Sequence, residues 1–483
     1  MRAQRTALIC LIAASAALST DAHAQKMFNR GPAPDVGRPV GPGGGGGGFR
    51  GPGWGAVVPG IIMTVPQGYR SAGPVVDDNL PGQRRPQQAN RQRPSGAPPA
   101  NERRFVPDEV VIELSNSVGA QQVDALQRRF RLTRIESQRF QLSNSTLYRW
   151  RIPDRRSVAA VVRSLEGDRL VASAQPNYLF ALQQDQTTAG GDPAQYSLAK
   201  LHLLQAHALA KGANVLVAVI DSGVDVNHPD LAGSVAESFD AIPAAGTPHK
   251  HGTAIAGLIA AHGKLLGAAP SARILAVRAF DPRNAGAEGT TFNILKGIDW
   301  AVSRGANVIN MSFAGPPDPA IRRSLEVARR KGIVLVAAAG NAGVNSPPLY
   351  PAADPNVIAV TATDADDKLF EQASRGRHIA LAAPGAQVLV AIPDNGYEMS
   401  SGTSYSAAEV SGIVALMLQR KPGLTPDQVR TLLRATARDL GPKGADAMYG
   451  AGLANAYGAL MAETAPPLAA GSRPIERASA GAR

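Results

Sequence analysis

Residues 215–223 read Val-Leu-Val-Ala-Val-Ile-Asp-Ser-Gly, a continuous apolar run that ends in a carboxylate. An uninterrupted run of this length before a turn predicts a strand that is buried on both faces, as strands of parallel sheets are. Open parallel sheets gather their functional groups at the carboxyl ends of the strands. Asp221 therefore lies where a functional site is expected.

The same rhythm of apolar strands and helical stretches continues to about residue 461. Helices are predicted at residues 292–304 and 320–330, and two more, 404–420 and 426–435, follow the last strand. The predicted strands are 215–220, 274–278, 308–311, 333–338, 357–361 and 388–391. Alternation of this kind predicts an α/β fold with a doubly wound, mostly parallel sheet.

Two further stretches carry side chains that complement Asp221. His251 opens an alanine-rich helix, and Ser404 stands where the small polar run 399–407 meets an apolar helix. At a helix N-terminus the unpaired N–H groups and the positive end of the dipole stabilise negative charge on a bound oxygen. Taken singly, these residues read as a turn residue, a structural histidine and a helix cap. Together they supply the orienter, general base and nucleophile that acyl transfer by serine requires.

Three short motifs in chain order resemble those of the subtilisin-like serine proteases: Asp221-Ser222-Gly223-Val224, His251-Gly252-Thr253 and Gly402-Thr403-Ser404. A fourth, Ala-Ala-Ala-Gly-Asn at 337–341, resembles the strand end that carries the family's oxyanion amide. The resemblance covers residues 190–463 and implies a serine endopeptidase. It implies that Asp221, His251 and Ser404 are catalytic, and that Asn341 joins the Ser404 backbone N–H in an oxyanion hole.

The resemblance also implies where a substrate binds. It implies that Ser312, Phe313 and Ala314 pair with an extended peptide. It implies that Ala338, Ala339 and Gly340 form walls of the pocket for the substrate residue before the cut. These walls are small and contain no acidic residue. We therefore expect an apolar or broad preference at that substrate position.

Two departures from the family pattern concern the nucleophile helix and metal binding. Ala408 replaces a proline that usually follows the serine, which bears on the geometry of the helix. The loop 262–267 offers no carboxylate or amide for the tight calcium site of some relatives, and Ca²⁺ takes six to eight oxygen ligands. We expect no cofactor and no metal site. The acidic cluster 364–367 is read as a weak calcium ligand set or as a solvated turn.

Residues 105–183 are patterned as a separate small domain. Strands are predicted at 110–114, 147–152 and 171–178, and helices at 121–130 and 157–165. This order suits a ferredoxin-like α/β domain, and it resembles the inhibitory propeptide of the same protease family. The resemblance implies an intramolecular inhibitor whose last strand, 178–184, crosses the substrate cleft by β-augmentation. We expect a cut between about residues 183 and 192; the alternative is a domain that stays attached.

The first 24 residues have the pattern of a secretory signal peptide. Arg2 and Arg5 precede an apolar core at 6–18, and Ala-His-Ala at 22–24 is a cleavage site. The single cysteine, Cys10, lies within this signal, so the exported chain has no thiol. No later stretch is long and apolar enough to predict a membrane span. The protein is predicted to be secreted or periplasmic.

The formal net charge of +12 is carried mostly by one segment. Residues 25–104 are rich in Gly, Pro and Arg, hold 11 basic against 4 acidic side chains, and are predicted to be a disordered linker. Residues 190–463 are balanced, with 23 of each, so the charge does not indicate a specific nucleic-acid partner. The linker is a spacer or an arm for an anionic envelope component. Residues 464–483 are predicted to be a flexible tail.

Two rival functions fit the sequence less well than a protease. An α/β-hydrolase esterase needs Gly-x-Ser-x-Gly and the order Ser, Asp, His, whereas the residue two past Ser404 is Ser406 and the order is Asp, His, Ser. The other rival is a catalytically decayed secreted protein that binds through its basic arm, with Ala408 as a mark of decay. A decayed site would be expected to lose one of the catalytic residues, and all are present.

Overall fold

The computed structural model describes residues 95–183, 195–243, 246–282 and 287–462. The predicted signal peptide, most of the predicted linker and the predicted tail lie outside these residues, as does the joint at 184–192. Residues 95–104, the last part of the predicted linker, are described and contact the domain that follows: the Ser95 hydroxyl donates to the Glu166 carboxylate at 2.7 Å.

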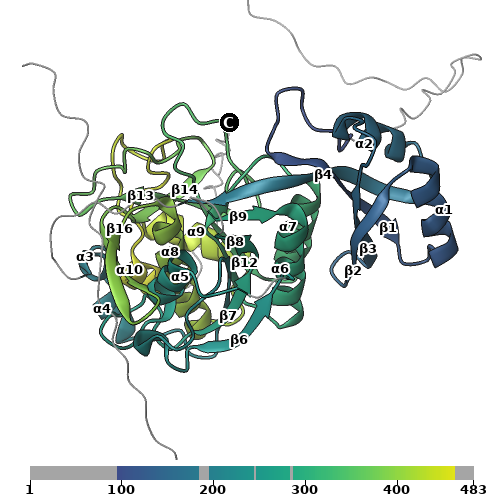
Figure 1. Cartoon of the computed structure of the whole chain (residues 1–483). Coiled ribbons are helices and arrows are strands. Elements are labelled where there is room, and N and C mark those ends of the chain that lie inside the picture. Colours follow the sequence, from purple (N-terminus) through teal and green to yellow (C-terminus); the bar gives the residue numbers. More distant parts are fainter. Residues whose placement is uncertain (1–94, 184–194, 244–245, 283–286, 463–483) are drawn as a thin grey trace, which may run out of the picture. The chain divides into compact units, whose positions relative to one another are not determined.

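A seven-stranded parallel sheet forms the centre of the larger domain in the described part of the chain (Figure 1). Its order is β14 (Ile379–Pro384), β13 (Ile358–Thr363), β12 (Val334–Ala338), β10 (Val308–Met311), β5 (Leu216–Asp221), β7 (Arg273–Arg278) and β6 (Val235–Asp240). From β5 the chain goes first to the edge strand β6 and returns to β7 beside β5, and it then crosses to β10 and runs outward to β14 on the other side. This reversal between β5 and β10 confirms the predicted doubly wound fold and marks a ligand-binding position.

Alternate residues of β5 face two different layers of helices. Val217 and Val219 belong to the core that includes α5 (Lys250–Ala260) and α8 (Thr403–Arg420). Ala218 and Ile220 belong to the opposite core, which includes α6 (Thr291–Ser303) and α7 (Pro319–Arg330). Both faces of the strand are therefore apolar, which explains why its sequence is a continuous apolar run. Helices α9 (Pro426–Thr436) and α10 (Ala456–Ala462) follow α8.

The structure corrects the prediction at the last strand. Residues 388–391 lie in β15 (Val388–Ile392), which pairs antiparallel with β16 (Gly396–Ser400) outside the parallel sheet. The edge positions of that sheet are taken instead by β14 and β6, which the pattern did not reveal. Strand β14 is alanine-rich and half of β6 is polar, so neither has the β-branched composition from which strands are predicted.

The smaller domain has the order of a ferredoxin-like fold. Its elements are β1 (Phe105–Ser115), α1 (Ala120–Phe130), β2 (Thr133–Phe140), β3 (Ser145–Arg151), α2 (Val158–Glu166) and β4 (Val171–Leu182). The sheet order is β2-β3-β1-β4, with antiparallel neighbours. Strand β2 was not predicted, because its sequence is polar and largely exposed.

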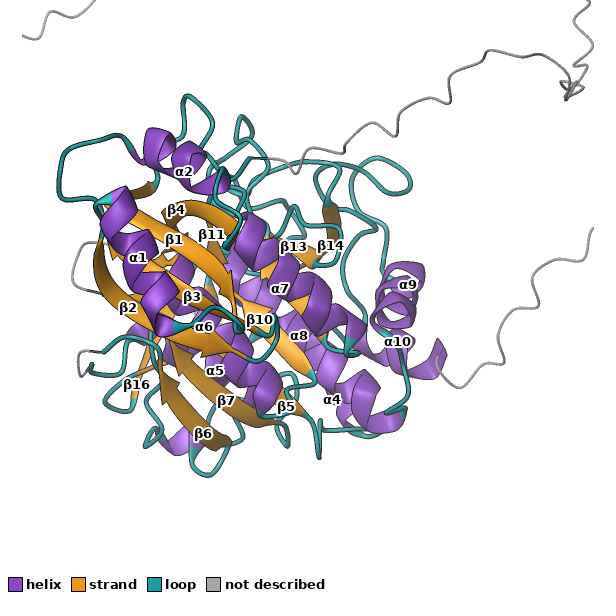
Figure 2. Cartoon of the chain, turned by 90° about the vertical axis from the view of Figure 1, so that its right-hand side faces the viewer, coloured by secondary structure: helices purple, strands orange, loops and turns teal. Residues whose placement is uncertain are grey.

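The two faces of this small sheet bury different surfaces. One face packs on α1 and α2 and includes Ile112 and Trp150. The other face, with Phe140 and Leu147, joins the core that contains residues of α6 and α7. The sheet of the small domain thus packs on helices of the larger one (Figure 2).

Strand β4 runs beyond the small domain into the larger one. It pairs antiparallel with β9 (Glu288–Thr290) on one side and with β11 (Phe313–Ala314) on the other. Strand β8 (Phe280–Asp281) pairs with β9 in turn. Short helices α3 (Tyr196–Lys200) and α4 (Leu203–His207) resume the described chain after β4. None of the described helices is long and apolar enough to cross a membrane.

Candidate active site

Asp221 and His251 are brought together where the end of β5 meets the start of α5. Asp221 is the last residue of β5, and His251 is the second residue of α5. The approach depends on Gly252, because a Cβ atom there would lie 2.2 Å from the Gly223 carbonyl oxygen. The His251 Nδ1 atom lies 2.8 Å and 2.9 Å from the two carboxylate oxygens of Asp221. Both side chains are fully buried.

These contacts fix the tautomer of the histidine. An ionised carboxylate only accepts hydrogen bonds, so Nδ1 of His251 donates its proton to Asp221. The other ring nitrogen, Nε2, is therefore the one that can accept a proton. It is buried and has no hydrogen-bond partner among the described residues.

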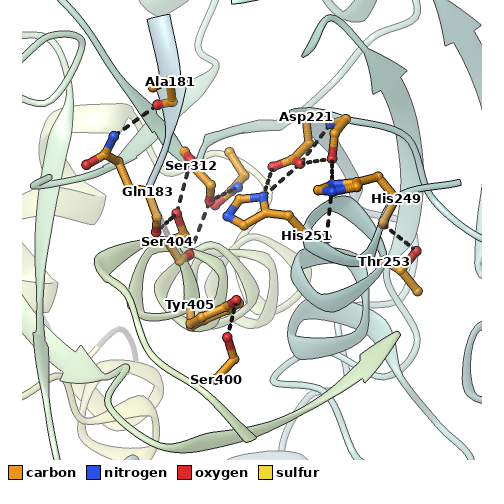
Figure 3. Close-up of polar contacts among 12 residues, drawn as sticks. Ala181, Gln183, Asp221, His249, His251, Thr253, Ser312, Ser400, Ser404 and Tyr405 are labelled. Carbon is orange, nitrogen blue, oxygen red and sulfur yellow. Dashed lines mark hydrogen bonds and ion pairs between the residues drawn. The ribbon is translucent and has the colours of Figure 1, made fainter. Parts of the chain in front are cut away.

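Ser404 lies at the N-terminus of α8, at the same edge of the sheet. Its hydroxyl donates to the carbonyl oxygen of Gln183 at 2.6 Å and to that of Ser312 at 3.0 Å (Figure 3). The Ser312 hydroxyl in turn donates to the Ser404 carbonyl at 3.1 Å. The nucleophile position is thus held between two carbonyls, and its hydrogen bond to His251 is not made in this state.

Asn341 follows β12 and points its amide toward the start of α8. Its Oδ1 accepts from the Thr403 backbone N–H at 3.1 Å and from the Thr403 hydroxyl at 2.9 Å. These two bonds fix the orientation of the amide. Its Nδ2 is buried without a hydrogen-bond partner in the described part of the chain. A buried, unused donor beside a helix N-terminus suits a negative charge that develops during a reaction.

A peptide strand occupies the groove that leads to Ser404. In the register of β4, Ala181 faces Ala314 and Leu182 faces Phe313, while Phe180 faces Gly289 of β9 on the other side. The Gln183 N–H donates to the Ser312 carbonyl at 3.3 Å. The extended segment from Phe180 to Gln183 is therefore the middle strand of a three-stranded arrangement that ends at Ser404.

The predicted substrate-binding residues fall into two groups in the structure. Ser312, Phe313 and Ala314 line the occupied groove. Ala338, Ala339 and Gly340 are fully buried, and the Gly340 N–H donates to the Thr403 hydroxyl at 3.1 Å. The Gln183 side chain instead accepts from the Asn341 N–H at 2.8 Å and donates to the Ala181 carbonyl at 3.0 Å. The role of Ala338, Ala339 and Gly340 as pocket walls stays a prediction.

Strand β9 and Gln183 were not among the predicted binding residues. The stretch Glu-Gly-Thr at 288–290 is too short to show a strand period. Its only sequence signal is Gly289, where a Cβ atom would lie 2.7 Å from the Phe280 ring. Glycine in a short strand marks such a close approach.

Ala408 does not interrupt the helix that carries Ser404. Helix α8 is continuous over 403–420, and residues 403–418 are all buried. The Ser406 hydroxyl donates to the carbonyls of Ala383 and Pro384 at 3.0 Å and 2.9 Å, which ties the first turn to the end of β14. The helix start is thus fixed by contacts that do not require a proline at position 408.

The acidic cluster at 364–367 is engaged in ion pairs. Asp367 pairs with Arg438 at 2.7 Å and with Lys200 at 3.0 Å, and Asp366 pairs with Lys368 at 3.4 Å. Among the described residues no group of three or more His, Cys, Asp or Glu side chains is arranged to hold a metal ion.

Comparison with known proteins places this geometry in a family. The model of the subtilase family matches residues 212–452, and that of the fervidolysin N-terminal prodomain matches residues 91–177. Thermitase of Thermoactinomyces vulgaris is 36% identical over 275 residues, which cover 55% of this chain and 96% of thermitase. Subtilisin of Bacillus pumilus is 39% identical over 259 residues, covering 51% of this chain and 91% of that protein.

A solved structure extends the similarity to both domains. Fervidolysin from Fervidobacterium pennivorans, a keratinolytic enzyme related to subtilisin, aligns with a TM-score of 0.63 and 25% identity. The alignment covers 74% of this chain and 61% of fervidolysin. The predicted relationship is confirmed: the chain belongs to the subtilase family of serine endopeptidases and carries a prodomain ahead of its protease domain.

Proposed function

We propose that the protein is an exported serine endopeptidase, made as a zymogen, that cuts its own chain between Gln183 and Gln184. The observation that carries the proposal is the 2.6 Å contact between the Gln183 carbonyl oxygen and the Ser404 Oγ. That carbonyl ends a strand held by main-chain pairing on both sides, as a substrate would be.

The proposed reaction uses the groups around that carbonyl. The Ser404 hydroxyl turns to His251 Nε2, gives up its proton, and its oxygen bonds to the Gln183 carbonyl carbon. The backbone N–H of Ser404 and the Nδ2 of Asn341 stabilise the oxyanion. His251 then protonates the leaving amine of Gln184, and Asp221 stabilises the imidazolium. Water then gives a proton to His251 as its oxygen bonds to the acyl carbon. The bond to the Ser404 oxygen breaks, His251 returns the proton to that oxygen, and Gln183 leaves as a carboxylic acid that ionises in solvent.

After the cut, the small domain would remain bound as an inhibitor. Its contacts with the protease domain do not depend on the broken bond. Glu113 pairs with Arg323 at 2.9 Å, Glu136 pairs with Lys296 at 2.9 Å, and the buried Gln175 donates to Asp318 at 2.9 Å. These contacts and the paired strand keep the cleft filled until the domain is removed.

The substrates proposed are extended polypeptide segments that add a strand between β9 and β11. The residues from Phe180 to Gln183 show which side chains such a segment can present. The Phe180 ring is buried edge-on against Phe313, with centroids 5.9 Å apart, so a large apolar residue fits three positions before the one at the cut. We keep the expectation of an apolar or broad preference at the cut itself, with glutamine tolerated.

The test compares the full chain with Ser404→Ala and, as a matched control, Ser303→Ala on the exposed end of α6. Intact mass and N-terminal sequencing of the products should show a new terminus at Gln184 for the wild type and for Ser303→Ala. The Ser404→Ala chain should stay whole. A cut in Ser404→Ala would contradict self-cleavage.

A second readout separates a dead site from one that another protease activates. A fluorophosphonate probe, which labels activated serines, is applied before and after limited digestion of the small domain by an added protease. Labelling of the wild type but not of Ser404→Ala supports the nucleophile. If the wild type is never labelled, the chain is better explained as a binding protein that acts through its basic arm.

Export is part of the proposal because residues 1–24 have the pattern of a signal peptide. Removal of these residues should keep the protein in the cytoplasm in a cell-fractionation assay. The basic segment at 25–94 lies outside the described residues, and we retain both interpretations of it, spacer or arm for an anionic envelope component. Binding of the full chain to isolated envelopes at low and high salt distinguishes them.

A further inference from the structure

A second histidine is linked to the triad carboxylate. His249 immediately precedes α5, and its Nδ1 lies 2.8 Å from the Ser222 Oγ. The Ser222 Oγ lies 2.9 Å from Asp221 Oδ1. The backbone carbonyl of His249 accepts from the Thr253 hydroxyl and N–H at 3.0 Å and 3.1 Å, which holds the histidine in place. Asp221 therefore contacts His251 directly and His249 through one hydroxyl.

The Ser222 hydroxyl has one proton and two acceptors within reach. When Nδ1 of His249 carries a proton, it donates to the Ser222 oxygen, and the hydroxyl proton is free to go to Asp221. When Nδ1 is bare, it accepts either the Ser222 hydroxyl or the His251 backbone N–H, which lies at 3.4 Å. If Nδ1 takes the hydroxyl proton, Asp221 loses one of its three donors and keeps the Ser222 N–H at 2.7 Å and the His251 ring.

We propose that His249 is a positioning residue of the active site, which acts through Ser222 to set how strongly Asp221 is hydrogen-bonded and hence how basic the His251 ring is. This inference rests on the proposed triad. It adds a fourth titrating group that touches neither the substrate nor the reacting atoms.

The charges around His249 favour its neutral form at neutral pH. Burial lowers the pKa of its ring; the Asp221 carboxylate opposes this, and the positive charges of His251 and Lys250 add to it. The two basic side chains near His249, Lys250 and Arg278, are each paired with a carboxylate. Lys250 lies 3.4 Å from Glu398 of β16, and Arg278 of β7, which lies against Gly246 in the preceding loop, pairs with Asp240 at 2.6 Å.

Protonation of His249 should weaken catalysis in two ways. It turns the Ser222 hydroxyl onto Asp221. Because the Asp221 carboxylate then accepts one more hydrogen bond, it stabilises the His251 imidazolium less. It also places a positive charge beside that imidazolium, which repels it. As the pH falls, kcat/KM should therefore be lost through two protonations, one on His251 and one on His249, instead of through one.

The experiment measures kcat/KM against pH with protein that was produced as the full chain and has processed itself. The substrate is a peptide p-nitroanilide carrying Phe-Ala-Leu-Gln, the sequence of 180–183. In the wild type, log kcat/KM should fall at the acid end with a slope steeper than one. His249→Asn keeps an acceptor for the Ser222 hydroxyl, its Oδ1, but does not titrate, and its slope should be one. His207→Asn is the matched control, because His207 is also half-buried with a pKa lowered by burial, and its profile should follow the wild type.

Two more variants separate a positioning role from a merely structural one. His249→Ala removes the acceptor that holds the Ser222 hydroxyl, so this hydroxyl turns to Asp221, and kcat at the pH plateau should fall about three- to tenfold, the net value of one hydrogen bond, with KM unchanged. His249→Asn, whose Oδ1 can accept the same hydroxyl, should restore most of that loss. Ser222→Ala keeps both imidazoles and removes the link, so its acid slope should also approach one. A Ser222→Ala slope equal to that of the wild type would overturn the relay.

A measurement without turnover keeps this inference separate from the proposed function. In Ser404→Ala protein labelled with ¹³C-histidine, NMR titration should give a higher pKa for His251 in the His249→Asn background than with His249 present. Equal His251 values in the two backgrounds, or coincident rate profiles of wild type and His249→Asn, would overturn the inference. A wild-type chain without activity would contradict the proposed function, and the NMR result would still decide the coupling.

Discussion

The carbonyl oxygen of Gln183 lies 2.6 Å from the hydroxyl oxygen of Ser404. The strand that delivers this carbonyl comes from the same chain and is paired on both sides, so the candidate nucleophile already faces a peptide bond. The hydroxyl donates to the carbonyl rather than to His251. Turning of the Ser404 side chain to His251 is therefore the step that would start the reaction.

This relationship predicts that the first cut is intramolecular. The fraction of chain cut at Gln183 should follow first-order kinetics with a rate that does not change when the protein is diluted tenfold. Quenched time points resolved by gel electrophoresis provide the measurement, and Ser404→Ala mixed with wild type provides the control for cutting between molecules. A rate that rises in proportion to concentration would show that one molecule cuts another.

Asn341→Ala should lower kcat with little change in KM. The amide Nδ2 is buried without a partner among the described residues, so the hydrogen bond it can donate is expected to form with the oxyanion of the transition state and not in the ground state. The loss known for such an amide in subtilisin is about 10²–10³ in kcat, which sets the scale expected here. Asn356→Ala, at a half-buried turn asparagine, should be neutral. An equal rise in KM with kcat unchanged would assign Asn341 to substrate binding instead.

Phe180→Ala should shorten the interval between the cut and full activity. The Phe180 ring is 2% exposed and packs on Phe313, and loss of a buried phenylalanine costs about 3–5 kcal/mol. The bound small domain would then leave the cleft sooner. The lag is measured with a peptide substrate after processing begins, and Phe130→Ala, at the end of α1, is the control. An unchanged lag would mean that other contacts hold the domain.

Glu409→Gln should stabilise the protein at alkaline pH. Glu409 is buried in α8, hydrogen-bonded to Ser197, and burial raises the pKa of its carboxyl from 4.5 to about 8. Because the folded-state pKa is the higher one, its stability contribution is complete below the ordinary pKa and is lost as the pH rises toward 8. The loss above that pH is at most about 5 kcal/mol.

The measurement for this variant is the difference in thermal midpoint between Glu409→Gln and wild type, taken in the Ser404→Ala background to prevent digestion. The difference should grow in favour of glutamine from pH 5 to pH 9. Glu326→Gln on the exposed face of α7 should show no such trend. A difference that stays flat over this range would mean that Glu409 is not held neutral by burial.

Excess EDTA should leave activity and thermal midpoint unchanged. The loop at 262–267 closes on Asp230, whose carboxylate accepts from the Lys264 and Leu265 N–H groups at 2.6 Å and 3.0 Å, and the cluster at 364–367 is paired with basic side chains. Oxygen atoms engaged in this way are poor calcium ligands. A fall in thermal midpoint that added Ca²⁺ reverses would reveal a calcium site.

Particular elements show how much of the fold could be predicted. Strand β5 was predicted to within one residue because it is buried on both faces and so has a continuous apolar sequence. Strand β14 is buried as completely, but its alanines have low β-propensity, and only its pairing with β13 makes it a strand. Residues 388–391 have a good strand sequence and yet lie outside the parallel sheet, because they pair with β16, which follows directly in the chain.

The types of groups in the site can be predicted from the sequence: a carboxylate after a buried strand, a histidine and a serine at helix N-termini, and an amide after a strand. Local structure places each of them at the end of an element, so local pattern was sufficient. Which atoms meet depends instead on how distant elements pack. That Gln183 ends at Ser404, that β9 forms the second wall of the groove, and that His249 reaches Asp221 through Ser222 all depend on contacts between distant segments. Such contacts are set by packing and by close approaches such as Gly252 on Gly223, which leave no periodic trace in the sequence.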